Sequence, residues 1–395
     1  MKGRIKMRRC LLQMISGLVI ISMGLFLVPM SAFAEVENSE AGIIESEQIM
    51  TAEESEILKL AEDSPEISIN SVHSGDYWYD DIAGGVKIVA YTGSGGYVDI
   101  PATIAGKTVL EIGTNAFNGN NTLTGVNLPN SVLVLGLGSF YNCPNLDSVF
   151  LGNGLISIGN GSFWGAQALT SIIIPNSVAS IGYAAFTNCN ALTKITILNG
   201  SVSFGGDVFG MIPNVTIYGY AGSTAKSYAY ANTRPFVALP PAYQPVYYST
   251  HVQNVGWQVA RLNGEISGTV GQGLRLEGIM LSDNSPVNAV LEYQTHVQNI
   301  GWQPMVSDGA LSGTTGLGLR LEGIRIELDG VEWYKYDVYY RVHAQNRGWM
   351  GWAKNGESAG TEGMSLRLEG IQIMVVPKDS AAPGSTAFPF MSSLN

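Results

Sequence analysis

The last third of the chain contains one sequence pattern three times, and this triplication constrains the fold more than any other feature. Each copy begins with His-x-Gln-Asn-x-Gly-Trp and ends with Leu-Arg-Leu-Glu-Gly-Ile. The first of these segments occupies residues 251–257, 296–302 and 343–349. Such self-similarity predicts a repeat architecture in which every copy forms one structural unit. A catalytic site needs different residues in one place, whereas repeated units offer the same contact several times. The pattern therefore favours binding over catalysis.

A second repeat, with a period of 23 residues, precedes the first. Two sets of apolar residues keep this spacing: Phe117, Phe140, Phe163, Phe186 and Phe209, and Leu123, Leu146, Leu169 and Leu192. Each turn of such a repeat contributes one strand and can bury its apolar side only against the next turn. Residues 109–209 are therefore predicted to form a leucine-rich solenoid.

The 23-residue unit resembles a known repeat. Residues 158–175 read Ile-Gly-Asn-Gly-Ser-Phe-Trp-Gly-Ala-Gln-Ala-Leu-Thr-Ser-Ile-Ile-Ile-Pro, which is similar to the leucine-rich repeats of bacterial surface proteins called BspA-type. The resemblance covers residues 77–239. It implies a curved right-handed solenoid on a cell surface or in the secreted pool, with roles in adhesion and with no reaction.

Four apolar side chains of the solenoid are candidate contacts for a partner. Side chains alternate across a strand, so Phe150 and Ile173 are predicted to point outward and form a small apolar patch. Tyr141 and Trp164, each directly after a repeat Phe, are predicted to form an aromatic ladder on another face. Patches of this kind can mark contact sites, although scattered surface aromatics are also ordinary.

The three-copy region resembles the clostridial hydrophobic repeats with a Gly-Trp signature, called ChW repeats. The match covers residues 246–376 and rests on the two recurring segments and the small-Gly-Thr motif between them. It implies extracellular binding or assembly, with carbohydrate among the surface components that such repeats could contact. The third copy differs because Trp352 follows Trp349. If all three copies bind, we expect this copy to differ in affinity.

Alternation within each copy predicts its local fold. Tyr293, Thr295 and Val297 share one face of a strand, while Gln294 and His296 lie on the other. An Asn-x-Gly turn then places a Trp, and Leu-Arg-Leu-Glu-Gly-Ile reads as a second strand. We therefore predict an all-β module of three equivalent lobes about a pseudo-threefold axis, trefoil-like or prism-like. With the solenoid, the fold class is mainly β.

The repeated aromatic residues Trp257, Trp302, Trp349 and Trp352 are candidate ligand contacts with two interpretations. Each ring could lie flat at the surface as a stacking platform for a sugar, or it could fill the space between lobes. Burying a large apolar side chain stabilises a fold by about 2–3 kcal/mol, so packing alone is enough to explain these residues.

The repeated histidines His251, His296 and His343 are candidate contacts as well. Three imidazoles on the threefold axis could hold Zn²⁺, but their Gln neighbours are poor partners for a metal ligand. We expect a solvent-facing or hydrogen-bonded His on each lobe, and no metal or cofactor. The Arg and Glu of each Leu-Arg-Leu-Glu segment are expected to form an ion pair between lobes.

The amino-terminal region predicts export. Basic residues, an apolar stretch at 11–28 and Ala-Phe-Ala at 32–34 are typical of a secretory signal peptide over residues 1–34; an uncleaved membrane anchor is the alternative. Residues 35–76 are acidic and predict a disordered linker. The three-copy module is placed at residues 240–376. Residues 377–395 are predicted to be a flexible tail.

Charge and cysteine content narrow the function classes. The formal net charge of −11 argues against nucleic acid, whose binding rests on neutralising phosphates with Lys and Arg. Cys143 and Cys189 lie two solenoid turns apart and are predicted to be buried free thiols, because strands two turns apart are too distant for a disulfide.

The sequence therefore predicts a secreted or cell-surface protein without catalytic activity, and without a membrane span after signal cleavage. We expect its repeat surfaces to recognise an extracellular protein or polysaccharide in adhesion. The alternative is a structural scaffold for extracellular assembly. A carbohydrate-active enzyme is less supported, because carboxylate pairs of glycosidases leave no reliable spacing and the other common catalytic motifs do not occur in the sequence.

Overall fold

The computed structural model describes residues 65, 67–212, 214–239, 246–283, 289–330 and 332–393. The predicted signal peptide and most of the predicted linker lie outside these residues. The prediction of disorder is wrong at the carboxyl-terminal end of that linker, because β1 (Val72–Ser74) pairs there with β2 (Tyr77–Ile82). The acidic composition stops at Glu66, and the residues beyond it extend a sheet edge. Within the described part of the chain, no helix is long and apolar enough to cross a membrane.

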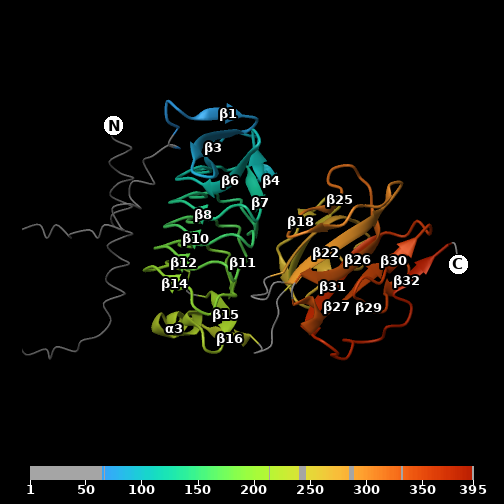
Figure 1. Ribbon diagram of the computed structural model, residues 1–395. Helices are drawn as coiled ribbons and strands as arrows, with labels where there is room; N and C mark the ends of the chain where they lie inside the picture. Colours follow the sequence, from blue (N-terminus) through green and yellow to red (C-terminus); the bar gives the residue numbers. More distant parts are fainter. Residues whose placement is uncertain are drawn as a thin grey trace, which may run out of the picture. The chain divides into compact units, whose positions relative to one another are not determined.

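One face of the solenoid begins with a hairpin of β2 and β3 (Gly85–Tyr91) and continues in parallel strands (Figure 1). The order is β6, β8, β10, β12 and β14, with bounds Lys107–Ile112, Val134–Leu135, Ser157–Ile158, Ser180–Ile181 and Ser203–Phe204. β5 (Thr103–Ile104) pairs antiparallel with β6. Neighbouring short strands pair residues 23 positions apart, such as Ile158 with Ile181. The predicted period is therefore the register of the sheet.

The opposite face of the solenoid consists of two shorter parallel sheets. The first contains β4 (Gly96–Asp99), β7 (Leu123–Asn127) and β9 (Ser148–Phe150). The second contains β11 (Ser171–Ile174), β13 (Lys194–Ile197), β15 (Thr216–Tyr220) and β16 (Phe236–Leu239). Helix α3 (Thr224–Ala231) lies against β15 and buries Ala225 and Ala229. It closes the apolar end of the solenoid.

A column of aromatic rings runs through the solenoid core. The five Phe residues of the 23-residue repeat stack with ring centroids 4.9 to 5.8 Å apart, and each is at most 2% exposed. Cys143 and Cys189 lie beside this column as buried free thiols, and their Sγ atoms each lie 3.1 Å from a backbone carbonyl oxygen. Both predictions, the solenoid and the free thiols, are confirmed.

The second part of the chain folds into three lobes of one design, namely lobe 1 (246–283), lobe 2 (289–330) and lobe 3 (336–377). Each lobe is built on a long antiparallel pair: β17 (Val246–Val252) with β21 (Leu276–Asp283), β22 (Ala289–Val297) with β26 (Leu321–Gly330), and β27 (Tyr336–Ala344) with β31 (Leu368–Pro377). The predicted alternation is confirmed, since Tyr248, Tyr293 and Tyr340 are fully buried in one shared core.

Short strands complete each lobe. The Gly-Trp strands are β18 (Gly256–Trp257), β23 (Gly301–Trp302) and β28 (Gly348–Trp349), and each pairs with the first long strand of its lobe. The strands that follow them are β19 (Arg261–Leu262), β24 (Val306–Ser307) and β29 (Ala353–Lys354). A 3-10 turn, η1 (Trp333–Lys335), precedes β27.

The three lobes are joined in a closed ring. β25 (Ser312–Gly313) of lobe 2 pairs with β21 of lobe 1, β30 (Ala359–Glu362) of lobe 3 pairs with β26 of lobe 2, and β20 (Ser267–Gly268) of lobe 1 pairs with β31 of lobe 3. A Cβ added at Gly268, Gly313 or Gly360 would lie 2.4 to 2.5 Å from the carbonyl oxygen of the neighbouring lobe. This close approach explains the repeated small-Gly-Thr motif, and the ring confirms the predicted pseudo-threefold module.

The carboxyl-terminal segment corrects the prediction of a flexible tail at 377–395. The hydroxyl of Tyr339 donates to the carbonyl of Ser380 at 3.0 Å, and the backbone N–H of Trp352 donates to the carbonyl of Ser385 at 2.8 Å. β32 (Phe390–Ser392) then adds a parallel strand to β30. The backbone of this segment therefore has partners in lobe 3, which the composition of the segment did not indicate.

Candidate functional site

Each lobe carries the same His, Glu and Arg cluster. In lobe 1, Nδ1 of His251 lies 3.2 Å from Oε2 of Glu277, and Nη2 of Arg275 lies 2.7 Å from Oε1 of the same carboxylate. The corresponding distances are 3.1 and 2.8 Å in lobe 2, and 3.2 and 2.8 Å in lobe 3. Because Arg and Glu stand two residues apart on one strand, the ion pair lies within a lobe. The expectation of a pair between lobes is wrong.

The clusters hold the repeated histidines in place inside the fold. The three glutamates are at most 5% exposed, and burial lowers the pKa of His251 although the Glu277 charge acts in the opposite direction. In every lobe the glutamate that contacts the imidazole belongs to the second long strand of the same lobe. Within the described residues no three His, Cys, Asp or Glu side chains are grouped to hold a metal ion.

Each repeated Trp ring is covered on one side by the histidine of its own copy. The rings of His251 and Trp257 are 5.5 Å apart in an edge-to-face arrangement, and copies 2 and 3 repeat it at 5.4 and 5.6 Å. A second group also covers each Trp: Tyr97 at 5.6 Å for Trp257, and an arginine at 4.1 Å for Trp302 and at 4.8 Å for Trp349.

Trp352 lies beneath the same arginine as Trp349, Arg341, at 4.9 Å, and is 4% exposed. Trp257 and Trp352 are therefore buried, whereas Trp302 and Trp349 remain partly exposed.

The candidate patch on the solenoid lies against lobe 1. Phe150 and Ile173 point out of the solenoid core as expected, but they are only 3% and 8% exposed because they share a cluster with Tyr247, Trp257 and Met280. The structure thus brings two solenoid candidates together with one repeated Trp. Tyr141 and Trp164 lie elsewhere, with ring centroids 6.0 Å apart, half-buried beside Leu137 and Tyr183.

We define the outer face of a lobe by four equivalent positions on its strands. They are Ser249, Ala260, Met280 and Ser282 in lobe 1, Gln294, Met305, Arg325 and Glu327 in lobe 2, and Arg341, Trp352, Gln372 and Met374 in lobe 3. In lobe 1 the solenoid covers this face. The hydroxyl of Tyr247 donates to the carbonyl of Leu151 at 2.6 Å, and Nδ2 of Asn153 donates to Oγ of Ser282 at 2.6 Å.

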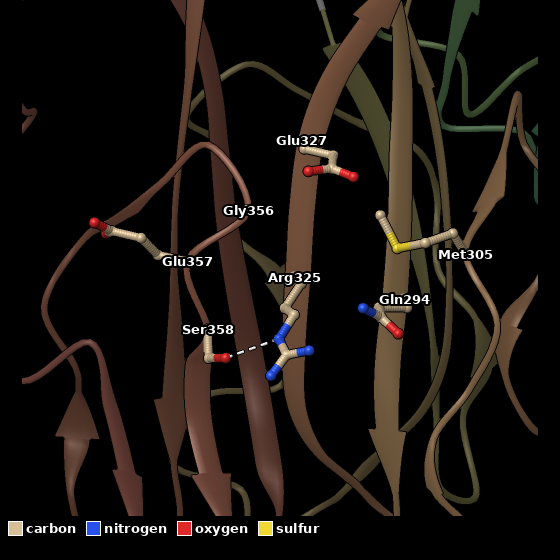
Figure 2. A pocket seen from close by; sticks show the side chains of 7 residues that line it. All are labelled: Gln294, Met305, Arg325, Glu327, Gly356, Glu357 and Ser358. Carbon is tan, nitrogen blue, oxygen red and sulfur yellow. Dashed lines mark hydrogen bonds between the residues drawn. The ribbon is translucent and has the colours of Figure 1, made fainter.

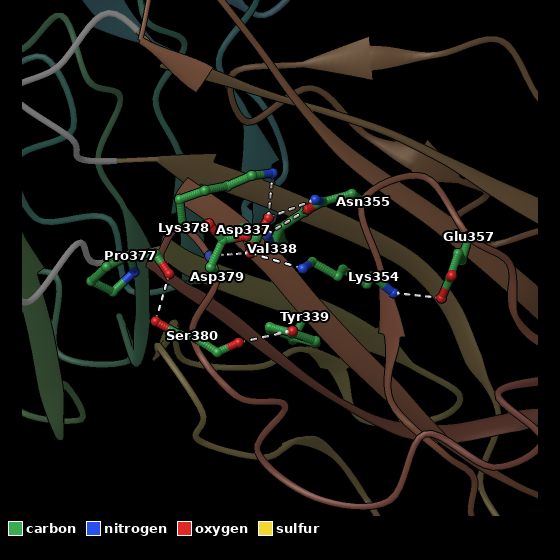
Figure 3. A network of polar contacts seen from close by, with 10 residues as sticks. All are labelled: Asp337, Val338, Tyr339, Lys354, Asn355, Glu357, Pro377, Lys378, Asp379 and Ser380. Carbon is green, nitrogen blue, oxygen red and sulfur yellow. Dashed lines mark hydrogen bonds and ion pairs between the residues drawn. The ribbon is translucent and has the colours of Figure 1, made fainter. Parts of the chain in front are cut away.

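In lobe 3 the carboxyl-terminal segment covers the outer face, through the contacts of Tyr339 and Trp352 described above. A polar network fixes the start of that segment (Figure 3). Asp337 is fully buried, and its carboxylate accepts hydrogen bonds from Lys378 at 2.8 Å and Lys354 at 2.9 Å. Asn355 and the backbone N–H of Asp379 add two more. Burial alone would raise the pKa of Asp337, but these hydrogen bonds hold it well below its ordinary value.

In lobe 2 the outer face opens into a cavity of about 470 Å³ (Figure 2). All four outer-face residues of this lobe line it, together with the lobe 3 loop 356–358. Nε of Arg325 donates to Oγ of Ser358 at 2.9 Å, and its guanidinium lies over Trp302. In Figure 2, Gln294 and Met305 lie on one side of Arg325 and Ser358 lies on the other, with Glu327 further along the same strand.

Gln294, Arg325 and Glu327 are not among the candidate site residues expected from the sequence, because those candidates are the residues that the copies share. The signal that could have found them is the position where the copies differ. The residue after the repeated Gly-Ile is Met280 in lobe 1, Arg325 in lobe 2 and Gln372 in lobe 3. A variable residue between invariant ones marks a place where the three lobes face different surroundings.

Comparisons with known families match both halves of the chain. The BspA type Leucine rich repeat region matches residues 98–233 in six copies. The Clostridial hydrophobic W family matches residues 251–282, 296–330 and 343–377.

Solved structures give similar proteins over part of the chain. The T. pallidum leucine-rich repeat protein TpLRR is 30% identical, over 37% of this chain and 70% of that protein, with a TM-score of 0.36. A leucine-rich repeat protein from Bacteroides capillosus is 31% identical, over 32% of this chain and 98% of that protein, with a TM-score of 0.30. A leucine rich cell surface protein from Faecalibacterium prausnitzii is 21% identical, over 41% and 56%, with a TM-score of 0.29. A comparison with curated proteins gives no match.

Proposed function

Because the chain belongs to the BspA-type leucine-rich repeat proteins and carries three ChW repeats, we propose that it is a secreted or surface-attached binding protein without catalytic activity. Its role is adhesion through the recognition of an extracellular protein or glycan. Both repeat families are typical of bacterial surface proteins, and the acidic chain is a poor partner for nucleic acid.

One observation supports the proposal above the others: the module uses the same outer face for docking in two of its three lobes. Lobe 1 receives the solenoid, and lobe 3 receives the carboxyl-terminal segment. The face is therefore suited to hold another surface, and in lobe 2 it is open. Binding of a ligand by lobe 2 would use the same face that holds the solenoid in lobe 1 and the carboxyl-terminal segment in lobe 3.

The repeated polar residues support a binding role over catalysis. His251 and Arg275 each contact Glu277 in lobe 1, and the other two lobes repeat the arrangement within 0.1 Å for the paired atoms. A buried carboxylate whose oxygens already contact Arg and His is poorly placed to reach a proton of a substrate. Threefold repetition of the cluster is expected of a structural feature.

A scaffold for extracellular assembly is the second candidate function. It is favoured by the half-exposed pair of Tyr141 and Trp164, which lies on a face of the solenoid away from lobe 1. Exposed aromatic pairs are enriched where proteins contact one another. Self-association through this pair would be lost in a Trp164→Ser variant.

The test of the proposed function is a binding measurement with the chain from Glu35 to Asn395, the predicted mature form. The labelled protein is titrated onto whole bacterial cells, purified polysaccharides and extracellular matrix proteins. We expect saturable binding that excess unlabelled protein displaces and that unrelated acidic protein does not. A chain that binds none of these surfaces and self-associates with rising concentration would support the scaffold instead.

A further inference from the structure

We propose that the outer face of lobe 2 is a binding site for a neutral, hydroxyl-rich sugar unit of a glycan, held by Arg325, Glu327 and Gln294. The inference rests on the proposed function and names the ligand class at one site. It is carried by the comparison of three equivalent faces in one molecule.

The three outer faces differ in the group that lies beside the loop glycine of the adjacent lobe. In lobe 1, Gly309 of the adjacent loop lies so close to Phe150 that an added Cβ would be 3.3 Å from the ring. In lobe 2 the equivalent loop residue is Gly356, and there the neighbour is the carboxylate of Glu327, 3.1 Å from an added Cβ. In lobe 3 the equivalent loop residue is Gly264, and its neighbour is the side chain of Met374, 3.4 Å from an added Cβ. Elsewhere on the same face, lobe 3 has Trp352 where lobe 2 has Met305. Lobe 1 therefore receives an aromatic ring of the solenoid where lobe 2 has a cavity.

The lining of lobe 2 is unsuited to a further aromatic anchor. Met280 and Ser282 of lobe 1 are replaced by Arg325 and Glu327. A phenyl ring seated there would remove a guanidinium and a carboxylate from water without offering them new hydrogen bonds, which is unfavourable. The ligand of lobe 2 must hydrogen-bond to both charged groups.

Charge selects among polar ligands. The second carboxylate of the lining, Glu357, accepts a hydrogen bond from the backbone N–H of Lys354 at 3.0 Å and points away from the other lining side chains in Figure 2. An anion that approaches Arg325 would be repelled by Glu327, and a cation that approaches Glu327 would be repelled by Arg325. A pair of neighbouring sugar hydroxyls satisfies both groups, because each hydroxyl can donate to the carboxylate and accept from the guanidinium. Gln294 supplies one more donor and one more acceptor, and Met305 offers an apolar contact to the C–H groups of a sugar ring.

Arg325 is held in position before any ligand arrives. Its guanidinium stacks over Trp302 at 4.1 Å, and its Nε donates a hydrogen bond to Oγ of Ser358 at 2.9 Å. The two remaining nitrogens have no hydrogen-bond partner within the described residues, and the Arg325 side chain lines the cavity (Figure 2). A stacked, planar donor group loses little further freedom on binding. In this arrangement Trp302 acts by positioning Arg325.

The test is isothermal titration calorimetry of the Glu35–Asn395 chain. The probes are neutral oligosaccharides of glucose, xylose, mannose, galactose and N-acetylglucosamine, with polygalacturonate as an anionic comparison. Two variants carry the lobe 1 residues at the equivalent positions, Arg325→Met and Glu327→Ser, which the same fold accepts in lobe 1. The matched control is Arg347→Ile, an exposed arginine of lobe 3 replaced by the residue of lobe 2.

We expect one neutral oligosaccharide to bind, at least a tenfold loss of affinity in each outer-face variant, and no change in Arg347→Ile. Glu327 is exposed, so its variant stays folded and remains informative if Arg325→Met does not fold. Equal binding by all three variants, or binding of polygalacturonate alone, overturns the inference and leaves the proposed function standing. If the chain binds cells or proteins saturably but binds none of the neutral oligosaccharides, the inference is likewise overturned and the proposed function stands. If the unsubstituted chain binds no glycan, no protein and no cells, the proposed function itself is contradicted.

Discussion

The ring of Phe150 in the solenoid lies 4.9 Å, centroid to centroid, from the ring of Tyr247 in lobe 1. This contact makes the solenoid and lobe 1 part of one apolar cluster that also contains Met280. Such a contact couples the unfolding of the two regions, because neither can open without exposing the ring of the other.

The first prediction is that Phe150→Ala lowers the free energy of unfolding by about 3 kcal/mol, the usual cost of removing a buried phenyl ring. The measurement is chemical denaturation followed by circular dichroism. The matched control is Ile156→Ala, because Ile156 is 48% exposed on the same solenoid and its loss is expected to change stability by less than about 0.5 kcal/mol. Equal effects of the two substitutions would show that Phe150 is not buried in solution.

The second prediction concerns the repeated cluster. Glu322→Gln removes the charge that contacts His296 and Arg320, while the side chain keeps its shape. A hydrogen bond to a charged group contributes about 1.5–3 kcal/mol, so we expect a loss of about 2 kcal/mol in urea denaturation. Glu332→Gln is the control, because among the described residues Glu332 forms an ion pair only with the half-exposed Lys335, and such surface pairs contribute about 0–1 kcal/mol. If both variants lose the same stability, the cluster is no stronger than a surface ion pair.

The third prediction is a pH dependence set by Asp337. Its pKa is lowered in the folded protein, so its contribution to stability is present above the unfolded value of about 3.9 and is lost as the pH falls below it. Asp337→Asn should therefore be about 2 kcal/mol less stable than the unsubstituted chain at pH 7. The difference should shrink as the pH falls from 4 toward 2 in thermal or urea denaturation. A constant difference across this range would mean that the carboxylate of Asp337 is not charge-paired.

The periodic features of the fold could be predicted from sequence because burial imposes a period. The 23-residue spacing predicted the stacked Phe117 and Phe140, and strand alternation predicted the buried Tyr248 and Tyr293. The small-Gly-Thr motif predicted a repeated feature but not its cause, which is the close approach of Gly268 to the next lobe.

The features that the sequence did not predict depend on contacts between segments far apart in the chain. Nothing in the sequence around Phe150 distinguishes an exposed patch from a docking surface, since both require an outward apolar residue. The partner of His251 was missed because Glu277 lies on the second long strand and becomes its neighbour only through the β17–β21 register. Arg325 stands out only when the three outer faces are compared in space.

The last prediction concerns the two thiols of the solenoid. Burial raises the pKa of both Cys143 and Cys189 to about 12, and the thiolate is the form that reacts with disulfide reagents. In the Glu35–Asn395 chain, which lacks Cys10, we therefore expect no reaction with Ellman's reagent in the native protein at pH 8, and reaction of both thiols once guanidinium unfolds the solenoid. A Cys143→Ala variant provides the calibration, because it should release half as much product on unfolding. Rapid native labelling would require the core beside Phe117 and Phe163 to open on the timescale of the assay, and would contradict the stacked column that carries the solenoid.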